Sequence, residues 1–69
     1  MDRMRIAKKL VELRGEATQA EIAKAVGVAQ STYAMYEIGK RVPTDEIKIK
    51  IAEHYHKTVQ EIFFEPILA

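Results

Sequence analysis

The 69-residue sequence contains no cysteine and no tryptophan, and it has only two prolines and three glycines. Without cysteine the chain can form neither a disulfide framework nor a thiolate metal site, which fits a reducing compartment. No apolar run reaches the roughly 18 residues of a membrane-spanning helix, and the first residues do not lead into the apolar core of a signal peptide. We therefore expect a cytoplasmic protein with no membrane partner.

An excess of charge of one sign is also missing. Eleven Lys and Arg residues nearly balance ten Asp and Glu residues, and the formal net charge is +1. Proteins that bind nucleic acid usually carry a basic patch, so such a function must be argued from the positions of individual residues. The length suffices for one domain, over 1–69. A core of that size supplies only about 3–5 kcal/mol, so well-formed helices or a partner would help it.

Patterns typical of catalytic and metal-binding sites are scarce. His54 and His56 are two positions apart, and such residues do not share a face of a helix. Asp45 and Glu46 are better explained as acidic residues in the first turn of a helix than as a general acid and base. Because no Ser/His/Asp set and no phosphate-binding loop is present, we expect no enzyme, no metal site and no cofactor.

The strongest pattern that is present covers residues 18–37, TQAEIAKAVGVAQSTYAMYE. Thr18 and Glu21 form a capping-box pattern that starts a helix, and Gly27 ends it. A second short helix over 29–37 follows directly. Two short helices joined by a glycine-containing turn are typical of a helix-turn-helix unit.

Two further helices are predicted on either side of this unit. Apolar residues at i, i+4 and i+7 predict an amphipathic helix over 4–14 that ends at Gly15. Thr44 caps a later helix with an acidic first turn. The alternating residues 47–51 would also suit a strand, but a lone strand has no partner here. We therefore predict a helix across this segment.

The last helix is short, and an apolar segment follows it. Thr58 and Glu61 repeat the capping-box pattern and start this fifth helix. The sequence thus predicts an all-α domain of five short helices around one core. The core covers about 4–63, and 64–69 form a proline-broken apolar tail.

These motifs resemble the lambda-repressor-like helix-turn-helix family, also called the Cro/cI or XRE family. TQAEIAKAVG is similar to the family's second helix, and AQSTYAMYEIGKRVP to its recognition helix and the following loop. The resemblance covers about residues 5–63 and also includes a terminal EIFF. It implies a compact five-helix domain that binds double-stranded DNA and regulates transcription, as repressors of phages and mobile elements do.

The sequence departs from the family pattern at three places. The turn over 14–18 is about two residues shorter than is common in the family. Ala29 stands where a Ser or Thr usually caps the recognition helix, and His56 stands where a glycine often ends the fourth helix. An uncapped recognition helix and the low net charge leave open a degenerate domain that binds nothing on this face.

The candidate base contacts lie on the second helix of the unit. A recognition helix enters the major groove with its first turn facing the base edges. Gln30 lies in that turn and can form hydrogen bonds with adenine N6 and N7, so we expect it to be the main residue that recognises a base. Ser31 lies beside it, and Ala34 and Met35 lie one turn on, where apolar groups suit thymine methyl groups. The alternative is that these residues are merely solvated.

The candidate phosphate contacts position the protein without reading sequence. Gln19 begins the second helix, beside its free N–H groups, and the resemblance implies a phosphate contact there. Lys40 and Arg41 are adjacent cations in the loop after recognition, with Thr44 behind them and Thr32 as a weaker candidate. The alternative for the two loop cations is an ordinary solvated turn.

The other face of the recognition helix is predicted to be structural. Tyr33 and Tyr36 share this face with Glu37, and we expect them to pack in the core with their phenol oxygens at the surface. A lone buried carboxylate is unfavourable. The family resemblance implies that Arg14 pairs with Glu37, and we expect this ion pair to orient the recognition helix.

The C-terminal apolar residues suggest an interface. A domain of this size can bury about two of them, and exposed apolar patches mark interaction sites. We expect a homodimer through Phe63, Phe64, Ile67 and Leu68 that reads a pseudo-palindromic operator with half-sites about 34 Å apart. A tail folded over its own core is the alternative arrangement. The alternative function is a protein-interaction module, such as an antitoxin, with a protein partner on the same surface.

Overall fold

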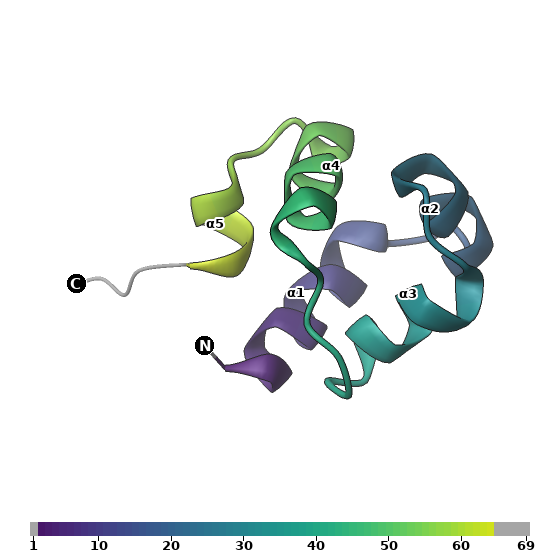
Figure 1. The fold of residues 1–69 in the computed structure, drawn as a ribbon, viewed down its shortest axis with the longest axis horizontal. Coiled ribbons are helices and arrows are strands. Elements are labelled where there is room, and N and C mark those ends of the chain that lie inside the picture. The colour runs from purple at the N-terminus through teal and green to yellow at the C-terminus, as the bar shows by residue number, and fades with distance from the viewer. Residues whose placement is uncertain (1, 65–69) are drawn as a thin grey trace.

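The computed structural model describes residues 2–64, which form five helices and no strand (Figure 1). The helices are α1 (Arg3–Arg14), α2 (Gln19–Val26), α3 (Gln30–Glu37), α4 (Asp45–Tyr55) and α5 (Val59–Phe63). The all-α fold expected from the sequence is confirmed, and the alternating segment 47–51 is helical. No helix in this part of the chain has the length and apolar character needed to cross a membrane.

Side-chain caps set where most of the helices begin. Both expected capping boxes form, with Thr18 and Glu21 at the start of α2 and Thr58 and Glu61 at the start of α5. In each box the threonine hydroxyl accepts from a backbone N–H while the glutamate accepts from the threonine N–H. Thr44 caps α4 with its hydroxyl alone, which accepts from the backbone N–H of Ile47. Three local signals in the sequence are thus enough to fix where these three helices start.

The starts of α1 and α3 differ from this pattern. Asp2 caps α1 by accepting hydrogen bonds from the backbone N–H groups of Met4 and Arg5, a cap that the sequence analysis did not identify. Ala29 precedes α3 in extended conformation and provides no side-chain hydrogen bond. α3 is therefore the one helix among residues 2–64 without a side-chain N-cap.

The turn after α3 lies against the start of α1. Gly39 has a φ of 78°, and a Cβ built there would lie 2.6 Å from the sulfur of Met4. A side chain at this position would have to displace Met4, and the left-handed backbone also favours glycine. His56 ends α4 with a φ of 57°, the one non-glycine residue with positive φ among residues 2–64.

The core lies where α3 packs against α1 and α2, and it continues between α4 and α5. Its buried side chains come from all five helices: Ile6, Leu10, Ile22, Ala23, Val26, Tyr33, Tyr36, Ile51, Ala52, Ile62 and Phe63. In Figure 1, α5 lies at the opposite end of the molecule from α2 and α3. The last helix and the helix-turn-helix unit therefore occupy separate ends of the described part of the domain.

Two expectations about aromatic residues are corrected by this packing. Phe63 is 1% exposed and belongs to the protein's own core, so it offers no surface to a second copy. Tyr33 is fully buried, and neither its hydroxyl nor that of Tyr55 has a hydrogen-bond partner among the described residues. The Tyr33 phenol oxygen therefore does not reach the surface. Burial raises the pKa of Tyr33 far above its ordinary value.

Arg14 and Glu37 form an ion pair that joins the end of α1 to the end of α3. Arg14 Nε lies 2.7 Å from Glu37 Oε2, and Nη2 donates to Oε1 at 3.0 Å. Arg14 Nη1 also donates to the carbonyl oxygen of Ala17, inside the short turn before α2. The Glu37 side chain is 3% exposed and that of Arg14 is 21% exposed. The short turn is thus compatible with the pair expected from the family resemblance.

The ion pair keeps Glu37 charged although the side chain is buried. Burial alone would raise the pKa of the Glu37 carboxyl, but hydrogen bonds from Arg14 and Gln19 outweigh this effect. The pKa of Glu37 therefore lies below its ordinary value, and the side chain is ionised at neutral pH. The hydrogen bond to Glu37 likewise raises the pKa of Arg14.

We predict that Glu37→Ala lowers the free energy of unfolding at pH 7 by about 1–3 kcal/mol, because Arg14 loses a charged acceptor. Since the folded pKa of Glu37 lies below the ordinary value of about 4.3, its contribution is complete above that pH. It is lost as the pH falls through the folded pKa. Urea denaturation of both proteins between pH 7 and pH 3 should show the difference in stability shrinking in the acid range.

The carboxyl of Glu61 does not affect this comparison of the two proteins. Its pKa is also lowered, by hydrogen bonds from Thr58, but both proteins contain it, so its effect cancels in the difference. Equal stability at pH 7, or a difference that stays constant with pH, would contradict the proposed role of the pair.

We also predict that Ala29→Ser raises the free energy of unfolding by about 1 kcal/mol, because it gives α3 the N-cap it lacks. Urea denaturation at neutral pH measures the change. Ala25→Ser is the matched control, since Ala25 is exposed on α2, where serine is a poorer helix former than alanine. A gain of the same size in both variants would rule out capping as the cause.

Candidate nucleic-acid interface

The surface of α3 is divided sharply between a buried and an exposed face. Tyr33, Tyr36 and Glu37 are buried against α1 and α2. Gln30, Ser31 and Met35 are exposed, and Ala34 is half-buried between them. The four side chains expected to contact bases therefore lie together on the free side of the helix. Thr32, the weaker phosphate candidate, is also half-buried.

The exposed face continues one residue further than the sequence analysis expected. Ile38, directly after α3, is 57% exposed and is the most exposed of the large apolar side chains among residues 2–64. It follows Gln30 and Ala34 at intervals of four, so it extends the same row. This spacing is the sequence signal by which Ile38 can be assigned to the exposed face.

The loop after α3 is attached to the end of that helix. The backbone N–H groups of Lys40 and Arg41 both donate to the carbonyl oxygen of Met35, at 3.0 and 3.3 Å. Both side chains are exposed. Thr44, at the end of this loop, uses its hydroxyl to accept the N–H of Ile47. The two loop cations are thus fixed next to the exposed face of α3.

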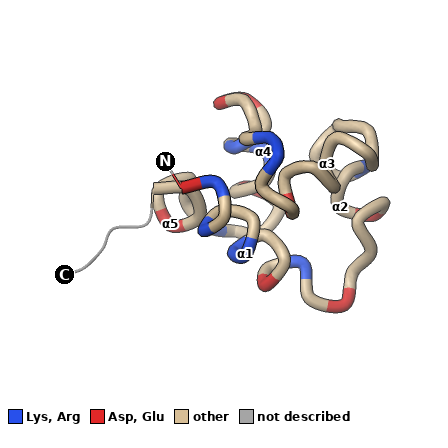
Figure 2. Tube along the Cα trace, turned by 90° about the horizontal axis from the view of Figure 1, so that it is seen from below, with Lys and Arg blue, Asp and Glu red and all other residues tan. Residues whose placement is uncertain are grey.

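Apart from the two cations of this loop, positive charge is not concentrated around the exposed face of α3. Figure 2 shows Lys and Arg residues spread over several segments, while α3 itself contains neither. The exposed face of α3 presents an amide, a hydroxyl and apolar groups. Such a surface is suited to reading base edges by hydrogen bonds and methyl contacts rather than by charge.

Gln19 lies at the start of α2 and is half-buried. Its Nε2 atom donates a hydrogen bond to Glu37 Oε1 at 2.9 Å, a contact that the sequence analysis missed. The bond joins the first residue of α2 to the last residue of α3. No local motif signals it, because it depends on how the two helices pack.

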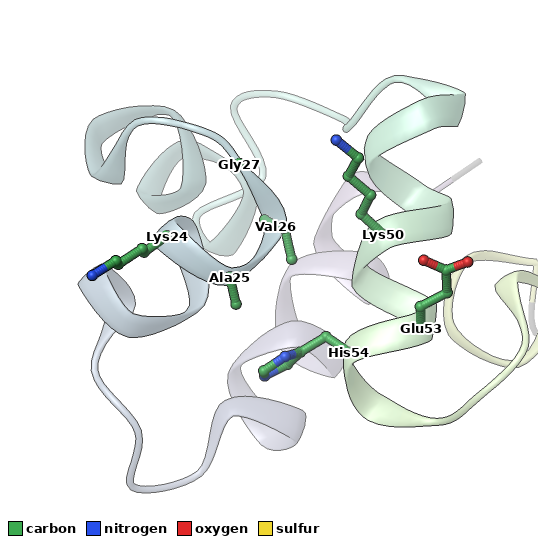
Figure 3. A pocket seen from close by; sticks show the side chains of 7 residues that line it. All are labelled: Lys24, Ala25, Val26, Gly27, Lys50, Glu53 and His54. Atoms are coloured by element: carbon green, nitrogen blue, oxygen red, sulfur yellow. The ribbon is translucent and has the colours of Figure 1, made fainter.

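A pocket of about 430 Å³ lies elsewhere, between the end of α2 and α4 (Figure 3). It is lined by Lys24, Ala25, Val26, Gly27, Lys50, Glu53 and His54. In Figure 3 the Lys24 side chain points away from the Lys50 ammonium group, so the two cations do not converge. None of the residues expected to contact DNA lines this pocket. Residues 2–64 also contain no group of three or more potential metal ligands.

Comparisons with known proteins agree with the presence of a helix-turn-helix unit. The family model described as helix-turn-helix covers residues 5–62. The chain is 33% identical over 61 residues to the cryptic phage CTXphi transcriptional repressor RstR of Vibrio cholerae, an alignment covering 86% of the chain and 54% of that protein. It is 35% identical over 60 residues to an uncharacterized HTH-type transcriptional regulator of Archaeoglobus fulgidus, covering 87% and 84%.

The chain thus spans about half the length of the first of these relatives and most of the second. No solved structure gives a significant match. The match over residues 5–62 includes all of α2 and α3 and the turn that joins them. The resemblance inferred from the motifs is confirmed: the chain belongs to the XRE-type helix-turn-helix family.

Proposed function

We propose that the protein is a sequence-specific DNA-binding transcription regulator, of the phage-repressor type, that reads the major groove with α3. The observation that carries the proposal is the division of this helix. Tyr33, Tyr36 and Glu37 hold one face in the core, and the opposite face presents Gln30, Ser31 and Met35 to solvent. The relatives named transcriptional repressor and transcriptional regulator support the same function.

Base recognition is assigned to the exposed face of α3. Gln30, in the first turn, can donate to adenine N7 and accept from adenine N6 through its side-chain amide. Ser31 can donate or accept and therefore discriminates less. Ala34 and Met35 offer apolar contact to thymine methyl groups. Ile38 extends this apolar part of the face toward the end of the helix.

Phosphate contacts are assigned to groups on either side of α3. Gln19 and the N–H groups at the start of α2 can donate to one phosphate, because those N–H groups lack intrahelical partners. Lys40 and Arg41 can contact another from the loop that is fixed to the end of α3. Because these two cations can neutralise only a few phosphates, we expect the affinity to depend only weakly on salt concentration.

The proposal predicts that the protein prefers the DNA upstream of its own gene over scrambled DNA by roughly 10³-fold or more. Both DNAs are titrated at low and moderate salt, because affinity without a stated salt concentration is uninterpretable. Gln30→Ala should reduce the preference by roughly 5- to 150-fold, the loss expected for one bidentate base contact. Val11→Ala, at an exposed position on α1, is the control and should change nothing.

Equal, weak and salt-sensitive binding to the two DNAs would contradict sequence-specific readout at this site. A preference that survives Gln30→Ala unchanged would keep the function but remove Gln30 from the set of base readers.

We further propose that the protein binds DNA as a homodimer through the end of α5, so that two copies read a pseudo-palindromic operator. Phe64 supports this, because the residue remains 48% exposed although the ammonium group of the buried Lys48 lies 5.0 Å from its ring centre. Ile67 and Leu68, also expected in this interface, lie outside the described residues. The position of α5, at the far end of the molecule from α3, leaves the DNA-facing helix free (Figure 1).

The homodimer predicts a concentration-dependent rise in mass by sedimentation equilibrium, either in the free protein or on operator DNA. Phe64→Ser should weaken self-association, because it removes the exposed apolar ring. Val11→Ser is the control, since Val11 is an exposed apolar residue on α1. A wild-type protein that stays monomeric both free and on DNA would refute the homodimer and favour a different protein partner at Phe64, as in an antitoxin.

A further inference from the structure

We propose that Glu37 is a positioning residue, which holds the side-chain amide of Gln19 in place to contact a DNA phosphate. The inference rests on the proposed DNA-binding function and assigns a second task to a side chain that was expected only to be structural. It makes the phosphate contact at the start of α2 dependent on the last residue of α3.

The geometry of the carboxylate allows both tasks at once. Glu37 Oε2 accepts from Arg14 Nε at 2.7 Å, whereas Oε1 accepts from Arg14 Nη2 at 3.0 Å and from Gln19 Nε2 at 2.9 Å. Because Arg14 contacts both oxygens, it fixes the plane of the carboxylate. The direction in which Oε1 receives the Gln19 amide is therefore set before any DNA arrives.

The chemistry of the two groups decides which end of the Gln19 amide faces inward. A carboxylate can only accept hydrogen bonds, so Glu37 holds the NH₂ group and not the carbonyl oxygen. A primary amide has two N–H donors, and one remains after the bond to Glu37 is made. A phosphate oxygen also only accepts, so this second N–H is the donor that suits the DNA backbone.

The arrangement links phosphate contact to base reading. Gln19 is the first residue of α2, Glu37 the last of α3, and Arg14 the last of α1. A long glutamine side chain on a surface helix would otherwise sample many rotamers, and fixing it on binding would reduce affinity. Preorganisation by Glu37 removes that loss and ties the phosphate contact to the orientation of the recognition helix.

A double-mutant cycle on DNA affinity tests the coupling. Gln19→Ala should weaken operator binding about 3- to 10-fold, the net loss typical of one hydrogen bond. Glu37→Met keeps the side-chain length but removes both acceptors, and in that background Gln19→Ala should cost less than about twofold. All four proteins are compared at a temperature where circular dichroism shows each of them folded.

The cycle separates positioning from a general loss of structure. If Glu37 only stabilises the fold, the effect of Gln19→Ala is the same with and without it, and additive losses overturn the inference. If the wild-type protein binds no DNA, the proposed DNA-binding function is refuted, and this result is distinct from refuting the positioning role of Glu37. Additivity in a protein that does bind leaves that function intact.

A second measurement needs no substitution at Glu37, in case the variant does not fold. The chain has three glutamines, and Gln30 and Gln60 are exposed while Gln19 is half-buried. In NMR spectra of the free wild-type protein, the Gln19 side-chain NH₂ should exchange more slowly with solvent than the other two, and it should move less. A Gln19 amide as mobile and as fast-exchanging as those of Gln30 and Gln60 would overturn the inference.

Discussion

The bidentate contact between Arg14 and Glu37 is the interaction on which the position of the recognition helix depends. α3 is only eight residues long and lacks a side-chain cap, and a helix of that length is marginal in water by itself. Its conformation therefore comes from tertiary contacts. Tyr33 and Tyr36 bury one face, and the ion pair fixes the end of the helix relative to α1. A buried carboxylate without its partner would be strongly unfavourable, so the pair also disfavours other orientations of α3.

The helices were predictable from the sequence because their signals are local. Thr18 with Glu21, Thr44, and Thr58 with Glu61 each act within one turn of their own helix. Such signals can be read without knowing the fold, and they also settled the ambiguous segment 47–51 in favour of a helix. The division of α3 into a buried and an exposed face likewise followed from spacing alone.

What the sequence did not reveal depends on how separate helices meet. The bond between Gln19 and Glu37 requires the start of α2 to lie beside the end of α3, and no local pattern encodes that placement. Phe63 and Phe64 are adjacent and chemically identical, yet one is buried and the other half exposed because α5 turns only one of them inward. The buried hydroxyls of Tyr33 and Tyr55 similarly result from packing across helices.

The absence of Lys and Arg from α3 has a consequence for how such a protein would search for its site. Non-specific affinity for DNA is almost entirely electrostatic, and so is the long-range attraction that speeds encounter. If Lys40 and Arg41 supply the phosphate contacts, such a protein would be held only weakly by the bulk of the chromosome, because α3 adds no cation of its own. Fewer copies would be bound to unrelated sequence, so even at a low cellular concentration a larger fraction of the protein would be free to bind the operator. The corresponding disadvantage is slower arrival, because sliding along DNA requires the same attraction.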